Sequence, residues 1–146
     1  MKNIEALKLD DFPLKTFDKV RYADTDRQGH VNNAIFATFL ETGRVEVLYN
    51  PEHPILSEGS SFVIASLKLD FLKEITWPGQ VDTGTGILKI GNSSIRIFQK
   101  LFQNEKCVAH AETVIVHVDD RTRRGSPLTD NARKTLGAWL MREVDP

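Results

Sequence analysis

The chain has 146 residues, of which 40% are hydrophobic and 27% are charged, and its formal net charge is −1. This length fits one domain, residues 1–146, and the composition is that of an ordinary globular protein. The nearly neutral charge argues against a nucleic-acid binder that relies on a broad basic surface. The single cysteine, Cys107, leaves no intrachain disulfide framework and indicates a reducing compartment.

The N-terminal residues MKNIEALKLDDF carry charges throughout and contain no apolar core of the kind that a secretory signal peptide needs. No apolar stretch of the sequence approaches the length of a membrane span. We therefore expect a cytoplasmic protein with no membrane span and no nucleic-acid partner.

The first half of the chain predicts a strand followed by a long helix. Residues 16–23, TFDKVRYA, alternate well enough for a strand. After a polar loop, Asn32 or Asn33 is suited to cap a helix, because an Asn side chain accepts hydrogen bonds from the free amides of the first turn. The helix is expected over residues 34–48 and is apolar on almost every side, which is typical of a helix wrapped by other structure. The prolines of YNPEHP end it.

From about residue 61 the pattern changes to long strands. Four segments are rich in β-branched and aromatic residues: FVIASLKLDFL (62–72), QVDTGTGILKI (80–90), SIRIFQKLF (94–102) and KCVAHAETVIVHV (106–118). Their short, turn-like separators WPG, GNS and QNE imply antiparallel neighbours. A last helix is expected to start near SPLTDNAR and to bury Leu136, Trp139 and Leu140. The predicted fold is α+β, with one antiparallel sheet curled around the long helix.

Residues 22–33, YADTDRQGHVNN, concentrate polar groups where the central helix begins. The first turn of a helix offers free amides and the positive end of a dipole, which bind anions or stabilise developing negative charge. Gly29 permits a close backbone approach, and Asp26 lies just upstream of those amides. A carboxylate beside an oxyanion site suits acyl-transfer hydrolysis, in which the carboxylate is the nucleophile or the general base.

The magnitudes favour an activated ester. A general base contributes about 10²–10⁴-fold in rate and one oxyanion donor about 10²–10³-fold, which together suit a thioester better than an amide. The same residues also have a structural interpretation, because Asp, Gly and Asn are ordinary turn and capping residues. Under that interpretation Asp24 is a local turn former, Asn32 and Asn33 are caps, and His30 is a hydrogen-bonded turn residue.

The stretch VRYADTDRQGHVNNAIFATFLETGR resembles the opening of the hotdog-fold thioesterases of the 4-hydroxybenzoyl-CoA thioesterase family. The shared pattern is a strand ending in D-x-D, then x-x-G and the long central helix. The likeness continues through DFLKEITWPGQVDTGTGILKIGNSSIRIFQKLF to the last strand. The HVNN run looks more like the plant acyl-carrier-protein thioesterases, whose motif is D-x-N-x-H-V-N-N. Asp26 and His30 match that motif, whereas Gln28 replaces its asparagine.

The resemblance implies a hotdog fold and a thioester hydrolase without metal or cofactor. The substrate would be an acyl-CoA or, as an alternative, an acyl-carrier-protein thioester. The family's catalytic aspartate maps onto Asp26, and its carbonyl-binding backbone amide falls at Asn33. His30 is a second catalytic candidate, and Gly29 and Asn32 join Asn33 as candidates for substrate binding.

The resemblance also implies a homodimer or homotetramer, because hotdog subunits place the acyl tunnel between two protomers. Phe36, Phe39 and Phe62 are candidates to line that tunnel, for an aromatic acyl group or a fatty chain alike. A hotdog protein that binds acyl ligands without catalysis is a further alternative, against which the intact Asp26 speaks.

Outside the loop, three residues are candidates for contacts with the substrate. Ser94 follows a turn where family members often meet the nucleotide or pantetheine. Arg123 and Arg124, in RTRR, suit the phosphates of coenzyme A, although a solvated charge run also explains them. Some hotdog thioesterases use a helical glutamate, but they lack the D-x-D loop, so we assign Glu41 a structural role, paired on the helix with Arg44.

Overall fold

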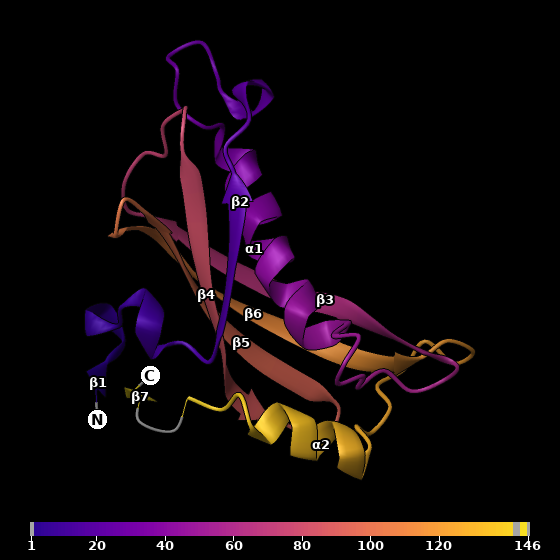
Figure 1. Cartoon of the computed structure of the whole chain (residues 1–146). Coiled ribbons are helices and arrows are strands. Elements are labelled where there is room, and N and C mark those ends of the chain that lie inside the picture. The colour runs from indigo at the N-terminus through magenta and orange to yellow at the C-terminus, as the bar shows by residue number, and fades with distance from the viewer. Residues whose placement is uncertain (1, 142–143, 146) are drawn as a thin grey trace.

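The computed structural model describes residues 2–141 and 144–145. Its longer elements are β2 (Leu14–Lys19), α1 (Asn33–Leu48), β3 (Ser60–Phe71), β4 (Gln80–Ile90), β5 (Ser94–Gln103), β6 (Lys106–Asp119) and α2 (Asp130–Gly137). The short elements are β1 (Lys2–Asn3), β7 (Val144–Asp145) and the 3-10 turns η1 (Ile4–Ala6), η2 (Leu9–Asp11) and η3 (Tyr22–Asp24). The predicted order of strand, long helix, four strands and short helix is confirmed (Figure 1).

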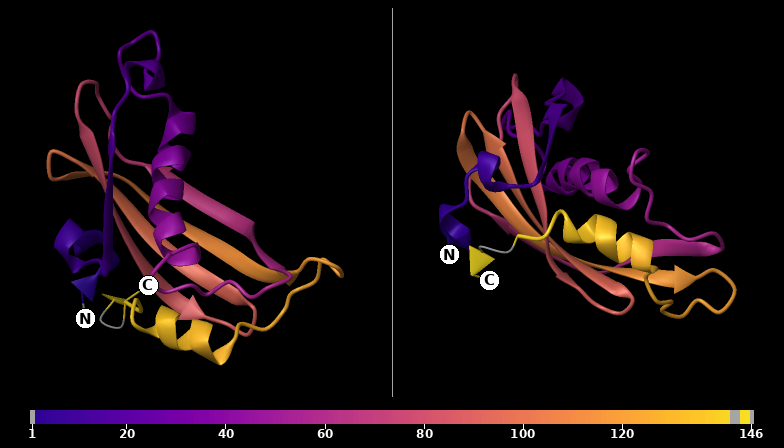
Figure 2. Two further views of the ribbon diagram at one scale, coloured as in Figure 1. Left: turned by 45° about the vertical axis from the view of Figure 1, so that its right-hand side comes forward. Right: turned by 60° about the horizontal axis from the view of Figure 1, so that its bottom comes forward.

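Five strands form one antiparallel sheet in the order β2-β4-β5-β6-β3. The sheet is strongly curved, and α1 lies on its concave face, as the two views of Figure 2 show. This is the predicted arrangement of a curled sheet around a central helix. Within the described residues, no helix is long and apolar enough to cross a bilayer.

The middle of α1 approaches the sheet closely through a glycine. The side chain of Gln99 on β5 donates hydrogen bonds from Nε2 to the Leu40 carbonyl, at 2.9 Å, and to Thr85 Oγ1, at 3.0 Å. A Cβ atom on Gly43 would lie 2.6 Å from both Gln99 Nε2 and Thr85 Oγ1. Only glycine therefore allows the helix to rest on these polar groups.

Apolar clusters lie on either side of this polar contact. The cluster around the first half of α1 includes Val20, Val31, Phe36, Phe39, Leu40, Ile75, Val81 and Leu101. The cluster around its second half includes Val47, Leu48, Ile87, Ile95, Ile97, Ile115 and, from the α2 region, Leu128, Ala132 and Leu136. Leu136 is fully buried as predicted, and Trp139 and Leu140 pack against the same cluster. One flank of α1 stays open in the single chain, where Val45 is 39% exposed.

The N-terminal segment crosses the convex face of the sheet, opposite α1 (Figure 2). The ring of Phe12 stacks on Phe98 at 6.0 Å between centroids and lies directly over Gly84. The buried Lys100 on β5 donates from Nζ to the carbonyl oxygens of Glu5 and Leu7, both at 3.2 Å. Burial lowers the pKa of Lys100, and these carbonyls satisfy its ammonium.

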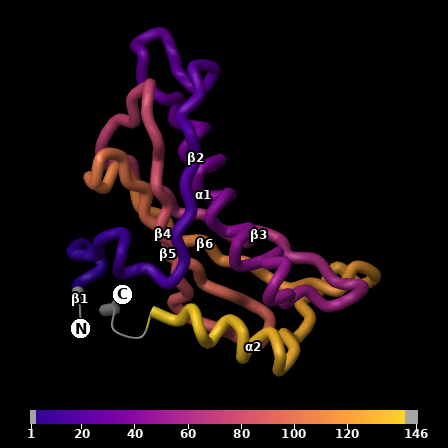
Figure 3. Tube along the Cα trace, viewed as in Figure 1, coloured from indigo at the N-terminus to yellow at the C-terminus, as the bar shows by residue number. Residues whose placement is uncertain are grey.

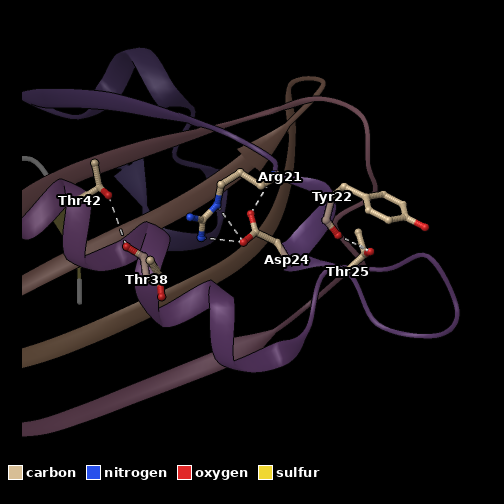
Figure 4. A network of polar contacts seen from close by, with 6 residues as sticks. All are labelled: Arg21, Tyr22, Asp24, Thr25, Thr38 and Thr42. Atoms are coloured by element: carbon tan, nitrogen blue, oxygen red, sulfur yellow. Dashed lines mark hydrogen bonds and ion pairs between the residues drawn. The ribbon is translucent and has the colours of Figure 1, made fainter.

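A buried aspartate holds the end of β2 against the loop that follows it (Figure 4). Asp24 is 2% exposed; its Oδ2 accepts from the Arg21 amide at 2.9 Å, and its Oδ1 accepts from Arg21 Nε and Nη2 at 3.2 and 2.8 Å. These bonds raise the pKa of Arg21. They also bend residues 22–24 into η3, so the predicted strand over residues 16–23 is wrong at its end and stops at Lys19. The structural interpretation of Asp24 is correct.

We predict that Gly43→Ala lowers the free energy of unfolding by about 1–3 kcal/mol, because the added methyl group overpacks the contact with Gln99 and Thr85. Urea unfolding followed by far-UV circular dichroism measures this. The matched control is Gly137→Ala at the end of α2, where a Cβ would meet nothing within 4 Å. Equal free energies of unfolding for the two variants would contradict this prediction and show that α1 can move away from the sheet at no cost in stability.

We predict that Asp24→Asn lowers the free energy of unfolding by about 1–3 kcal/mol, because the new amide points a donor at the donors of Arg21. Asp26→Asn is the control, since its side chain is exposed and an asparagine oxygen accepts the same bonds. Its stability is expected to stay within about 0.5 kcal/mol of wild type in the same urea titration.

Candidate active site

Residues 26–30 form a tight loop immediately before α1. The Asp26 amide donates to the His30 carbonyl at 2.8 Å, and the Gly29 amide donates to the Asp26 carbonyl at 3.2 Å. Gly29 has a φ of 79°, a left-handed conformation that favours glycine. Thr25 and Val31 pair at the base of the loop. The sequence therefore folds here as a miniature hairpin whose tip carries the predicted residues.

Backbone contacts with two neighbouring segments fix the position of this loop. The Asn32 amide donates to the Asp24 carbonyl at 2.8 Å, and the Val31 amide donates to the Ile75 carbonyl at 2.8 Å. His30 pairs with Thr76 in an isolated bridge. The loop is thus held between the end of β2, the first turn of α1 and the segment that follows β3, at one end of the long helix (Figure 3).

A cleft of about 390 Å³ opens beside the loop. It is lined by Asp26, Gln28, His30, Val31, Asn33, Phe36, Phe71, Leu72, Lys73 and Glu74. Three of the predicted site residues, Asp26, His30 and Asn33, therefore come together at one cavity, and Gly29 shapes the loop beside it.

The Asp26 carboxylate is held in one orientation by its own loop. Its Oδ1 accepts from the Gln28 amide at 2.8 Å and from the His30 amide at 3.3 Å. Among the described residues, no donor to Oδ2 is found, and the residue is exposed to the cleft. One oxygen thus anchors the group, and the other is available to a ligand.

Among the described residues, the first turn of α1 leaves one amide without an acceptor. The Asn32 side chain accepts from the Ala34 amide at 2.9 Å, so Asn32 is the cap, one of the two predicted candidates. The Ile35 amide donates to the Asn32 carbonyl at 2.9 Å. The Asn33 amide has no acceptor within the part of the chain that is described, and Asn33 lines the cleft. At the positive end of the helix dipole, this amide suits a polarised carbonyl oxygen.

His30 has a carboxylate partner that the sequence analysis missed. Its Nε2 lies 3.0 Å from Oε2 of Glu74, and both side chains line the cleft. Glu74 follows β3, far along the chain from His30, and the pairing of His30 with Thr76 brings the two segments together. No spacing or periodicity links these positions, so only the fold reveals the pair.

Aromatic side chains form the apolar wall of the cleft. Phe36 on α1 and Phe71 at the end of β3 pack edge to face, with centroids 5.0 Å apart. Phe36 is buried, whereas Phe71 and the adjacent Leu72 are 49% and 50% exposed. The apolar side of the cleft is therefore incomplete within one chain.

The predicted phosphate contacts lie far from this cleft in the same chain. Arg123 and Arg124 belong to the turn after β6, and β6 ends at Asp119, which pairs with Ser60 at the start of β3. The cleft adjoins Phe71 at the other end of β3, about 36 Å away for a strand of this length. The two ends of β3 are also well separated in Figure 1.

Two further candidates also lie outside the cleft. Ser94 opens β5 opposite Val116, near the same distant end of the sheet. Glu41 lies on α1 about 12 Å beyond Asn33 along the helix axis. Glu41 raises the pKa of the buried Arg44, and burial lowers it more strongly. Within the described residues, no cluster of three or more His, Cys, Asp or Glu side chains is arranged to hold a metal ion.

Known structures share this architecture over most of the chain. Protein PA5185 from Pseudomonas aeruginosa is 22% identical, with a TM-score of 0.81 over 91% of this chain and 95% of that one, which shows a common fold. A predicted thioesterase from Bacillus stearothermophilus is 30% identical, with a TM-score of 0.78 over 86% and 95% of the two chains. A thioesterase from Thermus thermophilus, crystallised with coenzyme A and Zn, is 28% identical, with a TM-score of 0.75 over 86% and 98%.

Comparison with curated protein sequences found no match. The family model described as the Thioesterase-like superfamily matches residues 20–140, which include the loop, α1 and the four strands β3 to β6. Together with the structural matches, this confirms the predicted hotdog fold, and the chain belongs to the Thioesterase-like superfamily.

Proposed function

We propose that this protein hydrolyses an acyl-CoA thioester to the free acid and coenzyme A. The observation that carries the proposal is the meeting of the Asp26 carboxylate and the unbonded Asn33 amide at one cleft. The Thermus thermophilus thioesterase that was crystallised with coenzyme A supports this choice of substrate.

In this mechanism the thioester carbonyl oxygen accepts a hydrogen bond from the Asn33 amide, and this bond polarises the carbonyl group. Asp26 removes a proton from a water molecule as the resulting hydroxide attacks that carbon, or its carboxylate attacks directly and the mixed anhydride is then hydrolysed. The carbon–sulfur bond breaks when the tetrahedral intermediate collapses, and the thiolate leaves and takes up a proton. The products are a carboxylic acid and the free thiol.

His30 and Glu74 act beside this centre. Glu74 lies 3.0 Å from His30 Nε2 and keeps the imidazole at the mouth of the cleft. The backbone amide of His30 donates a hydrogen bond to Asp26 Oδ1. His30 therefore contacts Asp26 through its backbone and Glu74 through its side chain. We assign His30 the role of orienting the substrate or the water, and we assign Glu74 the role of positioning His30.

The protein functions as a homodimer in this proposal. β3 is an edge strand of twelve residues with large apolar side chains exposed along it, among them Val63, Ile64 and Leu67. Such an edge pairs readily with another strand.

Pairing of β3 with its own copy also explains the distant arginines. In an antiparallel pair, the start of the partner's strand lies beside the end of this one, so the partner's Arg123 and the partner's Arg124 approach the mouth of the cleft. Guanidinium groups there suit the phosphates of coenzyme A. Ser94, near the same end of the sheet as these arginines, remains a candidate for a contact with the substrate.

We predict that Asp26→Asn lowers kcat by about 10²–10⁴-fold, because it removes the nucleophile or base and leaves the loop hydrogen bonds in place. Release of free thiol from short, long and aromatic acyl-CoAs measures this. Asp10→Asn, an exposed change on the N-terminal segment, is the control and should retain wild-type activity. Undiminished turnover in Asp26→Asn would contradict the mechanism, and no thiol release by wild type from any acyl-CoA or acyl-carrier-protein substrate would contradict the proposed activity.

We predict that Glu74→Gln lowers kcat/KM about tenfold, because it replaces a charged partner of His30 by a neutral one. If Glu74 acts through the imidazole, the double variant His30→Ala/Glu74→Gln will be as active as His30→Ala alone. The double-mutant cycle on thiol release decides this. Strictly additive losses would show that Glu74 acts independently of His30.

A further inference from the structure

The side chains of β3 that face α1 belong to even-numbered residues in the first half of the strand and to odd-numbered residues in the second half. Before the middle, Phe62 and Ile64 face inward, opposite His117 and Ile115 on β6. After the middle, Leu67 and Leu69 face inward, opposite Thr113 and Ala111. The change comes from a bulge between Ile64 and Ser66, where β3 holds one extra residue.

Because of this bulge, self-pairing sets inward side chains against inward ones only in alternate registers, and the register that pairs β3 over its full length has a twofold axis at the bulge. If a twofold axis passes through the bulge, Ile64 faces the partner's Leu67, Phe62 faces the partner's Leu69, and Ser60 faces the partner's Phe71. Every inward side chain then meets an inward side chain of the other copy. A shift by one residue would set inward side chains against outward ones along the whole strand. Ile64 and Leu67, 52% and 40% exposed in the single chain, cover each other in this register.

The register carries an aromatic group to the open side of the cleft. Leu69 packs against the apolar cluster that contains Phe36 and Phe39, and Phe71 lines the cleft itself. The partner's Phe62 lies next to Leu69 in the paired sheet and thus beside the exposed face of Phe71. This is where the apolar wall of the cleft is incomplete within one chain.

Phe62 is held firmly enough to act as a wall. Its ring contacts Tyr49 at the end of α1, at 6.1 Å between centroids, and His117 on β6, at 5.4 Å. His117 is 1% exposed, and its Nδ1 donates to the Ser126 carbonyl at 2.9 Å, which fixes the imidazole against the turn after β6. Phe62 therefore rests on a buried ring that is itself anchored.

We propose that the partner's Phe62 closes the acyl end of the cleft and sets the length of the acyl group that the enzyme accepts. This rests on the proposed function, and it assigns to one side chain of the second copy the choice between shorter and longer acyl chains. A smaller residue at position 62 extends the cleft by the space of the ring, and a larger one shortens it.

Disulfide cross-linking tests the register. In a Cys107→Ala background, Phe62→Cys/Leu69→Cys should form intermolecular disulfides under mild oxidation. Within one strand these positions are about 23 Å apart, so they cannot bridge in the same chain. The control Phe62→Cys/Leu67→Cys also places both thiols on the inner face, but out of register, and should cross-link at least tenfold more slowly. Equal or reversed rates would overturn the register and the proposal with it.

Mixed dimers test the role of Phe62 in trans. Two chains with different tags are co-expressed and the heterodimer is purified. In the dimer of Asp26→Asn with Phe62→Ala, the intact Asp26 faces the native Phe62 of the partner, so the acyl-length profile should match wild type. In the dimer of Asp26→Asn/Phe62→Ala with wild type, the intact Asp26 faces the alanine. Its preference for a substrate two methylenes longer should rise about tenfold. The opposite assignment would overturn the proposal.

Two further measurements test the role of Phe62 independently of the mixed dimers. Phe62→Trp, which keeps an aromatic ring, should shift the profile of the homodimer toward shorter chains, whereas an unchanged profile would overturn the proposal. Binding of non-hydrolysable thioether analogues of acyl-CoA, measured by calorimetry, should show the same length preferences. If wild type releases no thiol from any thioester, the proposed function fails, and the binding profiles of the same variants alone decide the role of Phe62.

Discussion

The first turn of α1 must be immobile and yet leave one backbone donor unused. The Asn32 amide bonds to the Asp24 carbonyl, and the Asn32 side chain covers the Ala34 amide, so the turn is fixed on both sides of Asn33. Because the cap bonds to the next amide along, the Asn33 amide stays available while the helix remains capped. The rest of the site is arranged around this one donor.

Asp24 and Asp26 show how two identical side chains separated by one residue come to differ. Asp24 is buried by η3 and accepts three bonds from Arg21, so all of its binding capacity serves the fold. Asp26 lies at the start of the hairpin loop. Its Oδ1 accepts hydrogen bonds from amides of that loop, and its Oδ2 is available at the cleft. Because the residue type is the same, the difference between the two carboxylates comes from their positions after the end of β2: Asp24 is buried in the turn η3, and Asp26 lies in the exposed loop at the cleft.

Local features of this site were predictable from the sequence, and contacts between distant segments were not. Capping by Asn32 and the placement of Asp26 beside the helix start depend on neighbours within a few residues. Both features could therefore be predicted from the local sequence. Glu74 meets His30 only because the end of β3 returns to the loop, which no local pattern encodes. The predicted strand over residues 16–23 failed at its end for a different reason: Asp24 bonds to Arg21 only three residues away, and the alternation of residue types does not reveal this local turn. The apolar character of α1 on nearly every side was visible, but one chain covers only part of it.

The contact of Lys100 with the N-terminal segment has a consequence for how that segment tolerates change. Lys100 binds the carbonyl oxygens of Glu5 and Leu7, groups that every amino acid possesses. Replacing the side chain at position 5 or 6 therefore leaves both acceptors in place. Inserting or deleting one residue between Glu5 and Phe12 would pull the carbonyls out of reach while Phe12 stays on Phe98. The segment is thus permissive in composition at positions 5 and 6 and strict in length between Glu5 and Phe12.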